Sequence, residues 1–388
     1  MTSHANAKCY HSQRGDYTVN KENLRKIIAL RHELHKYPEI SGHESQTKRR
    51  LMNFIENNTR LAVVDCGKFF YASRYVEGTK AAAFRADMDA LPMDESITLP
   101  YASLNPGASH KCGHDGHCAA LCGLALELEA LPVKKSVYLI FQHEEENGRG
   151  ARECSAILRE RNISSIYAFH NWSGYPEGSI VARPGVCQCA SAGLTVKFEG
   201  KTSHASEPEK GRNPSHAIAQ LILQAERLTQ TFSAKKVLCT VVNVRVGDKN
   251  FGISPALGEI SMTLRAENDS DMRTFCNAVL ESAENLAREN SLAMTRAISD
   301  YFTDTSSDPE CVKIVRASAE SLGLKVIDMA EPFKASEDFG LYTKMIPGAI
   351  FYIGNGETYP AIHTAEYDFN DNILGVAVDM FAEILRRS

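Results

Sequence analysis

Apolar residues recur at helical spacing in several stretches of the chain. Between residues 21 and 36, Leu24, Ile27 and Leu34 fall on one side of a helix, and Pro38 follows as a stop signal. The same spacing returns in four further stretches. The predicted helices cover residues 21–36, a run that opens at Gly42, and residues 215–228, 271–289 and 309–322.

Short apolar runs predict buried strands, and four of these runs lead into polar side chains. The runs cover residues 80–87, 136–141, 166–169 and 349–354. They lead into Asp87, the Glu144–Glu146 triplet, His170 and, after a short gap, His363. Ligands of open α/β sheets bind at the carboxyl ends of the strands. We therefore expect these side chains to lie at one edge of a buried sheet.

The pattern changes near Cys187. Strand-like stretches at residues 193–199, 237–246 and 259–266 alternate there with two of the predicted helices. Such a unit can cover one sheet face with helices, which predicts an inserted α+β domain in an α/β protein. The predicted divisions are a polar tail (1–15), the first part of the α/β domain (16–186), the inserted α+β domain (187–292) and the second part of the α/β domain (293–388).

Composition excludes several classes of protein. Hydrophobic residues make up 43% and charged residues 23% of the 388 residues, which is typical of a globular protein. A net charge of −5 gives no basic excess for nucleic-acid binding. No apolar run reaches the length of a membrane span, and the first twenty residues lack the apolar core of a signal peptide. The odd count of 11 cysteines then favours reduced thiols and a cytoplasmic location.

The densest candidate chemistry lies in the stretch from Cys112 to His117. It offers a thiol, two imidazoles and a carboxylate within six residues, and an apolar helical stripe beginning at Leu121 follows it. Cysteine and histidine are favoured ligands of zinc and similar cations. The alternative is a free cysteine beside a satisfied core histidine. The two glycines of the stretch and the further candidate ligands downstream favour a metal site at a helix N-terminus.

Together these side chains suffice for a hydrolytic site with two cations. The candidate metal ligands are Cys112, His114, Glu146, His170 and His363. Two divalent cations can share a hydroxide and polarise a carbonyl if one ligand bridges them. A carboxylate that binds no metal must then move the proton, and Glu145 is the candidate. Asp87, directly after a buried run, is a further catalytic candidate. The alternative is that Asp87 belongs to a solvated acidic loop without a catalytic role.

The sequence resembles the N-acyl amino acid amidohydrolases, a metallopeptidase family of aminoacylases, hippuricases and plant auxin-conjugate hydrolases. The similar segments run in family order from residue 31 to the C-terminal end, so the resemblance covers nearly the whole chain. The segments are Arg31, His35 and Pro38-Glu39; Phe84 to Pro92; Cys112 to His117; Glu145-Glu146; His170; Gly200 to Ala205; Ser336 to Phe339; and His363 with Tyr367 to Asp371.

This resemblance implies a split, metal-binding catalytic domain of the zinc-exopeptidase type with an inserted α+β lid that often dimerises. It implies that Cys112 bridges two divalent cations of zinc, manganese, nickel or cobalt. Glu146 and His363 would complete one cation site, and His114 and His170 the other.

The resemblance also implies roles for two further side chains and a class of substrate. Glu145 would be the general base and later the acid. His204 would polarise the substrate carbonyl, often across a homo-oligomer. We therefore expect a hydrolase in which a metal-bound hydroxide cleaves the amide bond of N-acyl amino acids or related small conjugates.

Three segments depart from the family pattern. Gln142-His143-Glu144 stands where the family has Gln-Pro-Ala. Asn171-Trp172-Ser173, directly after His170, stands where the family often has an apolar residue, a tryptophan and a proline. The segment from Phe251 to Pro255 stands where the family usually has an asparagine before an isoleucine–proline pair, and it lacks that asparagine. The predicted metal ligands are intact, whereas the substrate-facing loops differ.

Two other functions stay open at this stage. A non-catalytic metal- or ligand-binding protein that keeps the fold is one alternative, and the changed segment at Phe251 is its best support. A thiol redox module built on Cys112, Cys118 and Cys122 is the other, although no pair of cysteines separated by two residues begins at Cys112.

Overall fold

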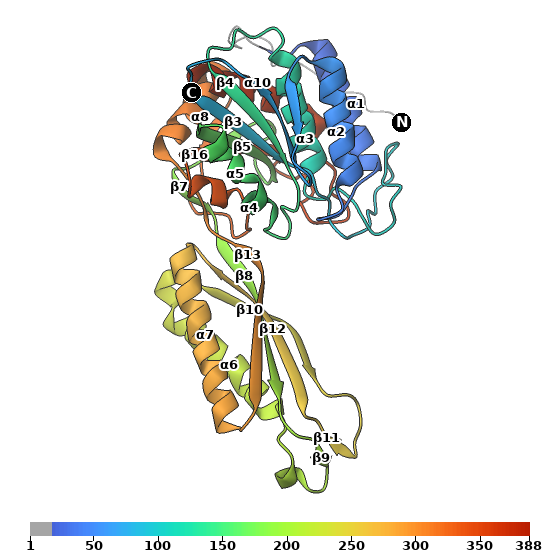
Figure 1. Cartoon of the computed structure of the whole chain (residues 1–388), viewed down its shortest axis with the longest axis vertical. Coiled ribbons are helices and arrows are strands. Elements are labelled where there is room, and N and C mark those ends of the chain that lie inside the picture. Colours follow the sequence, from blue (N-terminus) through green and yellow to red (C-terminus); the bar gives the residue numbers. More distant parts are fainter. Residues whose placement is uncertain (1–17) are drawn as a thin grey trace.

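A mixed eight-stranded sheet forms the centre of the larger part of the molecule (Figure 1). The structure, a computed structural model, describes residues 18–388, so the predicted tail at residues 1–15 lies outside the described residues. Four adjacent strands, in the order β4-β3-β5-β16, run parallel at its centre. Their bounds are Ser136–Gln142 for β4, Ala81–Asp87 for β3, Ile163–Ser173 for β5 and Gly348–Gly356 for β16.

Shorter strands flank this parallel centre. Beyond β4, the sheet continues antiparallel with β2 (Phe70–Arg74) and β1 (Ala62–Asp65). Beyond β16, it continues with β6 (Ile180–Ala182) and β15 (Val326–Asp328). Every residue of β3 and β4 is buried, as expected for parallel strands that are covered on both faces.

Helices cover both faces of the large sheet. One core packs α1 (Lys21–Lys36), α2 (Ser45–Asn58), α3 (His114–Glu127), α8 (Pro309–Ser321) and α10 (Leu374–Arg387) on one face. A second core packs α4 (Gly150–Cys154), α5 (Ala156–Glu160) and α9 (Gly340–Thr343) on the other. The result is the three-layer α/β architecture that the buried apolar runs predict.

A separate four-stranded antiparallel sheet extends away from this body (Figure 1). Its order is β10-β12-β8-β13, with bounds Leu238–Val246 for β10, Leu257–Ala266 for β12, Ala190–Glu199 for β8 and Ala293–Phe302 for β13. A third core packs α6 (Ser215–Thr231) and α7 (Asp269–Glu289) against one face of this sheet. We call residues 190–302 the four-stranded unit.

The four-stranded unit continues past the predicted limit at residue 292. β13 pairs with β8 from Ala293 onwards, so the sheet needs these ten residues. Most side chains of β13 are exposed, and the strand therefore lacks the buried apolar pattern that reveals a strand in a sequence. The division of the chain into domains is otherwise a prediction.

Four small strands and three short 3-10 helices complete the described chain. The strands are β7 (Gly185–Gln188), β9 (Ser203–His204), β11 (Ile253–Ser254) and β14 (Thr305–Ser307), and the helices are η1 (Pro208–Lys210), η2 (Ser233–Lys235) and η3 (Asp371–Ile373). Among the described residues, no helix combines the length and the apolar character needed to cross a bilayer.

Candidate metal centre

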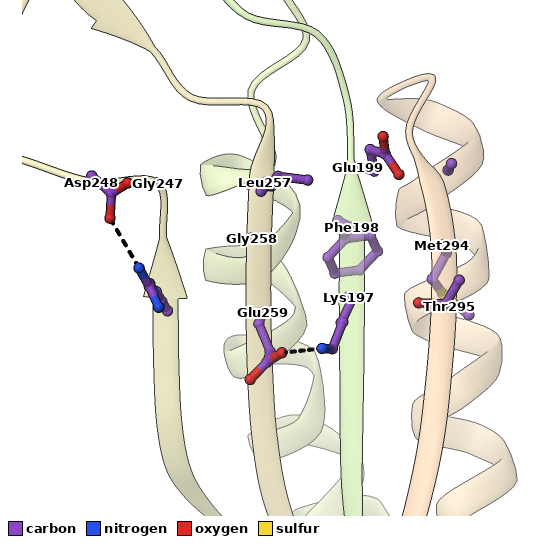
Figure 2. A pocket seen from close by; sticks show the side chains of 12 residues that line it. Lys197, Phe198, Glu199, Gly247, Asp248, Leu257, Gly258, Glu259, Met294 and Thr295 are labelled. Atoms are coloured by element: carbon purple, nitrogen blue, oxygen red, sulfur yellow. Dashed lines mark hydrogen bonds and ion pairs between the residues drawn. The ribbon is translucent and has the colours of Figure 1, made fainter. Parts of the chain in front are cut away.

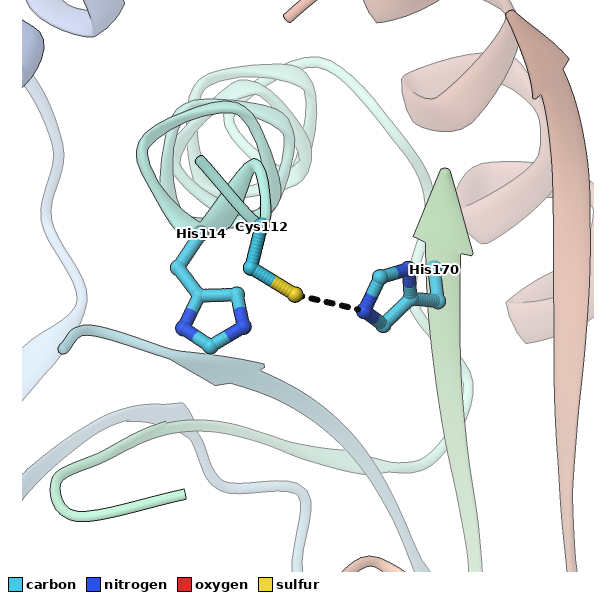
Figure 3. A group of neighbouring side chains, drawn as sticks. All are labelled: Cys112, His114 and His170. Atoms are coloured by element: carbon cyan, nitrogen blue, oxygen red, sulfur yellow. Dashed lines mark hydrogen bonds between the residues drawn. The ribbon is translucent and has the colours of Figure 1, made fainter. Parts of the chain in front are cut away.

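The carboxyl ends of the parallel strands bring the five predicted metal ligands together. His170 lies on β5, Glu146 follows β4, and His363 follows β16. Cys112 and His114 lie at the start of α3 and face His170 (Figure 3). Cys112 Sγ lies 3.4 Å from His170 Nε2 and 3.2 Å from His363 Nε2. Segments far apart in the sequence therefore converge on one thiol.

Two groups of three side chains share that thiol. Cys112, His114 and His170 form one group, and Cys112, Glu146 and His363 form the other. Within each group, the possible ligand atoms all lie within 4.8 Å of one another. Nitrogen, sulfur and oxygen donors at this spacing suit divalent cations of the zinc type.

Backbone carbonyls orient two of the imidazoles. His114 Nδ1 donates to the carbonyl of Asp89 at 2.8 Å, and His170 Nδ1 donates to the carbonyl of Asn171 at 2.7 Å. A carbonyl only accepts, so these contacts place the ring proton on Nδ1 and leave Nε2 with a free lone pair. Histidine ligands of metals are held in this way.

Two buried atoms in the centre have no hydrogen-bond partner within residues 18–388. They are His114 Nε2 and Glu146 Oε1, which lie 3.7 Å apart. A buried lone pair without a partner costs free energy, and a bound cation would remove this cost at both atoms. These residues therefore fit divalent cations.

The thiol of Cys112 points to the same conclusion. Burial, and then the nearby carboxylates of Glu146, Glu145 and Asp87, raise the pKa of Cys112 well above its usual range. A thiolate at this position needs positive charge beside it, which a divalent cation provides.

Special backbone conformations at two residues hold the cluster. Gly113, directly before α3, has a φ of 100°, and a Cβ there would lie 2.2 Å from Asn171 Oδ1. Only glycine fits such a position. His363 has a φ of 62°, and its backbone N–H donates to the carbonyl of Lys111 at 2.7 Å. The loop after β16 is thereby tied to the segment that carries Cys112.

Glu145 lies beside the ligand groups in a buried, acidic setting. Its Oε2 is 4.0 Å from His114 Nε2, and its Oε1 accepts a hydrogen bond from the backbone N–H of Asp338 at 3.3 Å. Burial, and then the carboxylates of Glu337, Glu146 and Asp338, raise the pKa of Glu145 well above its usual range. A carboxyl group with a raised pKa can take up and release a proton near neutral pH.

Asp87 is fully buried, so a solvated loop does not describe it. Its Oδ1 lies 2.6 Å from His117 Nδ1, and its Oδ2 accepts from Arg85 at 2.7 Å. Burial alone would raise the pKa of Asp87, but the charges of His114, Arg85 and His117 outweigh it and hold the pKa well below its usual range. Asp87 therefore orients its neighbours as a carboxylate.

Arg85 connects Asp87 to two acidic residues that the sequence patterns did not single out as site residues. Its guanidinium lies 3.1 Å from the carboxylate of Glu337 and donates to Asp338 at 2.8 Å. Gln142 Nε2 also donates to Asp338 at 2.8 Å. The segment from Ser336 to Phe339 contributes to the resemblance, but nothing in the sequence indicates that Arg85 reaches it.

A second set of polar contacts lies behind the ligands. His117 Nε2 lies 2.7 Å from Asn171 Oδ1, and Asn171 Nδ2 donates to Tyr367 Oη at 2.7 Å. Both nitrogens of His117 are therefore engaged by protein atoms, since Asp87 contacts the other. These contacts fix the loops that carry His170 and His363.

His204 is not part of this cluster. It is exposed on β9, at the end of the four-stranded unit that lies farthest from the large sheet (Figure 1). Its Nδ1 lies 2.6 Å from Ser206 Oγ. Phe251, in the segment that departs from the family pattern, is 90% exposed close to His204, because β11 pairs with β9.

A separate hollow of about 440 Å³ lies over the strands of the four-stranded unit, on the side away from its helices (Figure 2). Lys197 there pairs with Glu259 at 2.9 Å, and Arg245 pairs with Asp248 at 3.0 Å. These four charged side chains therefore pair with one another. The residues that line the hollow include no group of metal ligands like that of the metal centre.

Known proteins are similar to this chain in sequence and in fold. The profile of peptidase family M20/M25/M40 matches residues 83–387. An N-acetyl-L-cysteine deacetylase of Bacillus subtilis is 30% identical over 89% of this chain and 85% of its own length. A hippurate hydrolase of Campylobacter jejuni is 26% identical over 92% of this chain and 94% of its own. The structure of a dinuclear metal-binding M20 peptidase of Bacillus subtilis superposes with a TM-score of 0.79, at 25% identity, over 94% of this chain and 98% of that chain.

Proposed function

The chain belongs to peptidase family M20/M25/M40 and is a hydrolase of amide bonds, and on this premise we propose that it removes the acyl group from N-acyl amino acids. Acetyl and benzoyl groups are the acyl groups to test first, because relatives are named as an N-acetyl-L-cysteine deacetylase and a hippurate hydrolase. The observation that carries the proposal is one thiol, Cys112, shared by two ligand groups beside Glu145.

We assign the ligand roles by these two groups. Glu146 and His363 would hold one cation with Cys112, and His114 and His170 would hold the other. When bound, two divalent cations polarise a carbonyl and make water acidic enough to attack it near neutral pH. Zinc, manganese, nickel and cobalt are all compatible with these donors.

Glu145 would carry the proton in this reaction. Its carboxyl group is next to the ligands but is not needed as one, and its surroundings favour the protonated form once a proton arrives. It would take the proton from the attacking water and deliver it to the leaving amine. Asp87 would hold His117, and through it Asn171, in place during this transfer.

The alternative of a non-catalytic binding protein rests on the segment from Phe251 to Pro255. That segment lies on the far end of the four-stranded unit and leaves the metal centre intact (Figure 1). The presence of Glu145 beside a full ligand set supports hydrolysis over binding alone.

A reducing, cytoplasmic location stays a prediction, supported by the free state of every cysteine in the described chain.

A substitution of Glu145 tests the proposal. Glu145→Gln is expected to keep its metal and to lose activity by about 10²- to 10⁴-fold, because it removes only the proton carrier. Release of free amino acid from a panel of N-acetyl and N-benzoyl amino acids, with metal content measured in parallel, checks this. Glu160→Gln is the matched control, an exposed glutamate on α5. Full turnover by metal-loaded Glu145→Gln would remove Glu145 from this role.

A further inference from the structure

A second group of possible metal ligands lies beside the proposed catalytic pair, on the other side of the same turn. His143 and Glu144 directly follow β4, and Glu153 lies on α4. His143 Nε2 lies 3.2 Å from Glu153 Oε2 and 3.4 Å from Glu144 Oε2. None of these three residues belongs to the metal centre described above.

The imidazole of His143 is buried and unsatisfied. Its side chain is 0% exposed, and neither ring nitrogen has a hydrogen-bond partner among the described residues. A buried nitrogen lone pair without a partner is costly. Here Nε2 faces two carboxylate oxygens, so a cation between the three atoms would satisfy all of them.

The two separations from His143 Nε2 fit a metal ion, and the three side chains offer ligand atoms within 4.8 Å of one another. Ligand atoms bound to tetrahedral zinc at about 2.0–2.1 Å stand roughly 3.3 Å apart. The separations of 3.2 Å and 3.4 Å from His143 Nε2 agree with this value. Glu153 is 47% exposed, so solvent can reach the site and complete the coordination.

Lys68 shows that these carboxylates already attract a cation. Its ammonium lies 2.9 Å from Glu144 Oε2 and 3.1 Å from Glu153 Oε1. The side chain of Lys68 is 56% exposed and can turn into solvent. The ammonium supplies one charge, whereas a divalent cation would supply two charges and a bond to His143. Lys68 is therefore a competitor for the site.

The backbone holds the two sides of the site together. The carbonyl of Glu144 accepts hydrogen bonds from the N–H groups of Arg149 and Gly150, at 3.2 and 3.1 Å. A Cβ at Gly150 would lie 1.6 Å from the carbonyl oxygen of His143, so α4 starts in close contact with the end of β4. Glu153 is thereby fixed opposite His143.

We propose that His143, Glu144 and Glu153 form a further divalent-cation site, distinct from the site at Cys112. Its ligands are one imidazole nitrogen and two carboxylate oxygens, a donor set that suits zinc. The ion joins the end of β4 to α4. Because Glu145 and Glu146 lie between these two ends, it also stiffens the turn that carries them.

Metal counting at fixed free zinc tests this site. After equilibrium dialysis of the whole protein against zinc, the wild type is expected to bind one ion more per chain than Glu153→Gln. Glu160→Gln, with the same change of charge on the neighbouring helix, is expected to bind as many ions as the wild type. Because Glu153 and Glu160 are exposed, neither variant is expected to unfold.

A second variant separates the site from a simple ion pair. Lys68→Met removes the competing ammonium, so the dissociation constant of the additional zinc ion should fall by roughly two- to fivefold, as expected for a partly exposed charge. Equal zinc counts in the wild type and Glu153→Gln would overturn the proposal. Unchanged or weaker binding of the additional ion in Lys68→Met would also overturn it.

Discussion

At the scale of single residues, the metal centre depends on positions where only one type of residue fits. Cys112 is the one ligand common to both groups, and Gly113 beside it adopts a φ of 100°. A side chain at Gly113 would collide with Asn171, whose backbone carbonyl orients the imidazole of His170. Packing behind the ligands is therefore as specific as the ligands themselves.

Gly113→Ala tests this packing. The new Cβ would lie 2.2 Å from Asn171 Oδ1 and 2.9 Å from Tyr367 Oη, in a backbone region that alanine disfavours. We expect the free energy of unfolding, measured with urea, to fall by about 2–4 kcal/mol. Gly174→Ala is the control, because Gly174 has a φ of 92° and no atom within 4 Å of a Cβ. Its loss should be only about 1–2 kcal/mol, and equal losses would show that packing at Gly113 is unimportant.

At this scale, the sequence predicted which residue types form the site better than it predicted the contacts between them. The five candidate ligands are of types that metals bind, and each follows an apolar run or precedes a helix, so the repetition of this pattern predicted a site, and the resemblance implied their roles. Arg85, Glu337 and Asp338 could not, because their contacts join segments about 250 residues apart. His143 was visible only as a departure from a family pattern.

At the scale of elements, buried polar contacts attach α1 to α3. His35 on α1 lies with Nδ1 2.8 Å from Asp115 Oδ2 and with Nε2 3.0 Å from Glu95 Oε2. Burial opposes the charge, but the hydrogen bonds to Asp115 and Glu95 outweigh it and raise the pKa of His35 to about 9. Arg31, one turn earlier, donates to Asp368 at 2.7 Å. The charged His35 therefore helps to hold α1 against the helix that begins at His114.

This contact predicts a pH-dependent stability. A histidine whose folded-state pKa is raised stabilises the fold fully below the unfolded value of about 6.5, and this contribution is lost as pH rises through about 9. We expect the stability difference between the wild type and His35→Gln to shrink by about 3 kcal/mol across this range. Urea unfolding at several pH values measures it, with the exposed His216→Gln as control. A difference that is constant with pH would contradict the charged state of His35.

The central strands and the longer helices except α10 could be predicted from the hydrophobic pattern, whereas α10 and short strands such as β1, β6 and β15 were missed. The predicted helix at residues 21–36 has the bounds of α1, and the four apolar runs match β3, β4, β5 and β16. β13 was not predicted, because its side chains are mostly exposed. Its pairing with β8 depends on backbone hydrogen bonds, which produce no hydrophobic pattern in the sequence.

At the scale of the whole molecule, β9, which carries His204, lies at the end of the four-stranded unit that points away from the large sheet (Figure 1). The four-stranded unit also exposes large apolar side chains on its strands, including Val242 at 61% and Leu257 at 62%. Large exposed apolar side chains are candidates for burial against a second chain. We propose a homo-oligomer in which His204 of one chain serves the metal centre of another, and these two features support the proposal.

Mixing two inactive variants tests this arrangement. Glu145→Gln lacks the proton carrier and His204→Ala lacks the imidazole, but a mixed dimer holds one site with both groups. Subunit exchange at equal concentrations should restore about a quarter of the wild-type activity, since half of the dimers are mixed and each has one complete site. No recovery, in a mixture whose exchange is confirmed by mass, would place the action of His204 within its own chain or remove it from the reaction.

The most direct test of the account is the number of metal ions that depend on Cys112. Zinc is counted per chain in Glu153→Gln, which lacks the further site, and in the double variant Glu153→Gln with Cys112→Ala. A thiol shared by two cations predicts that the count falls from about two to below one, because both ion sites lose a ligand. A count that stays at two, or falls only to one tightly bound ion, would contradict a cysteine shared between the two groups.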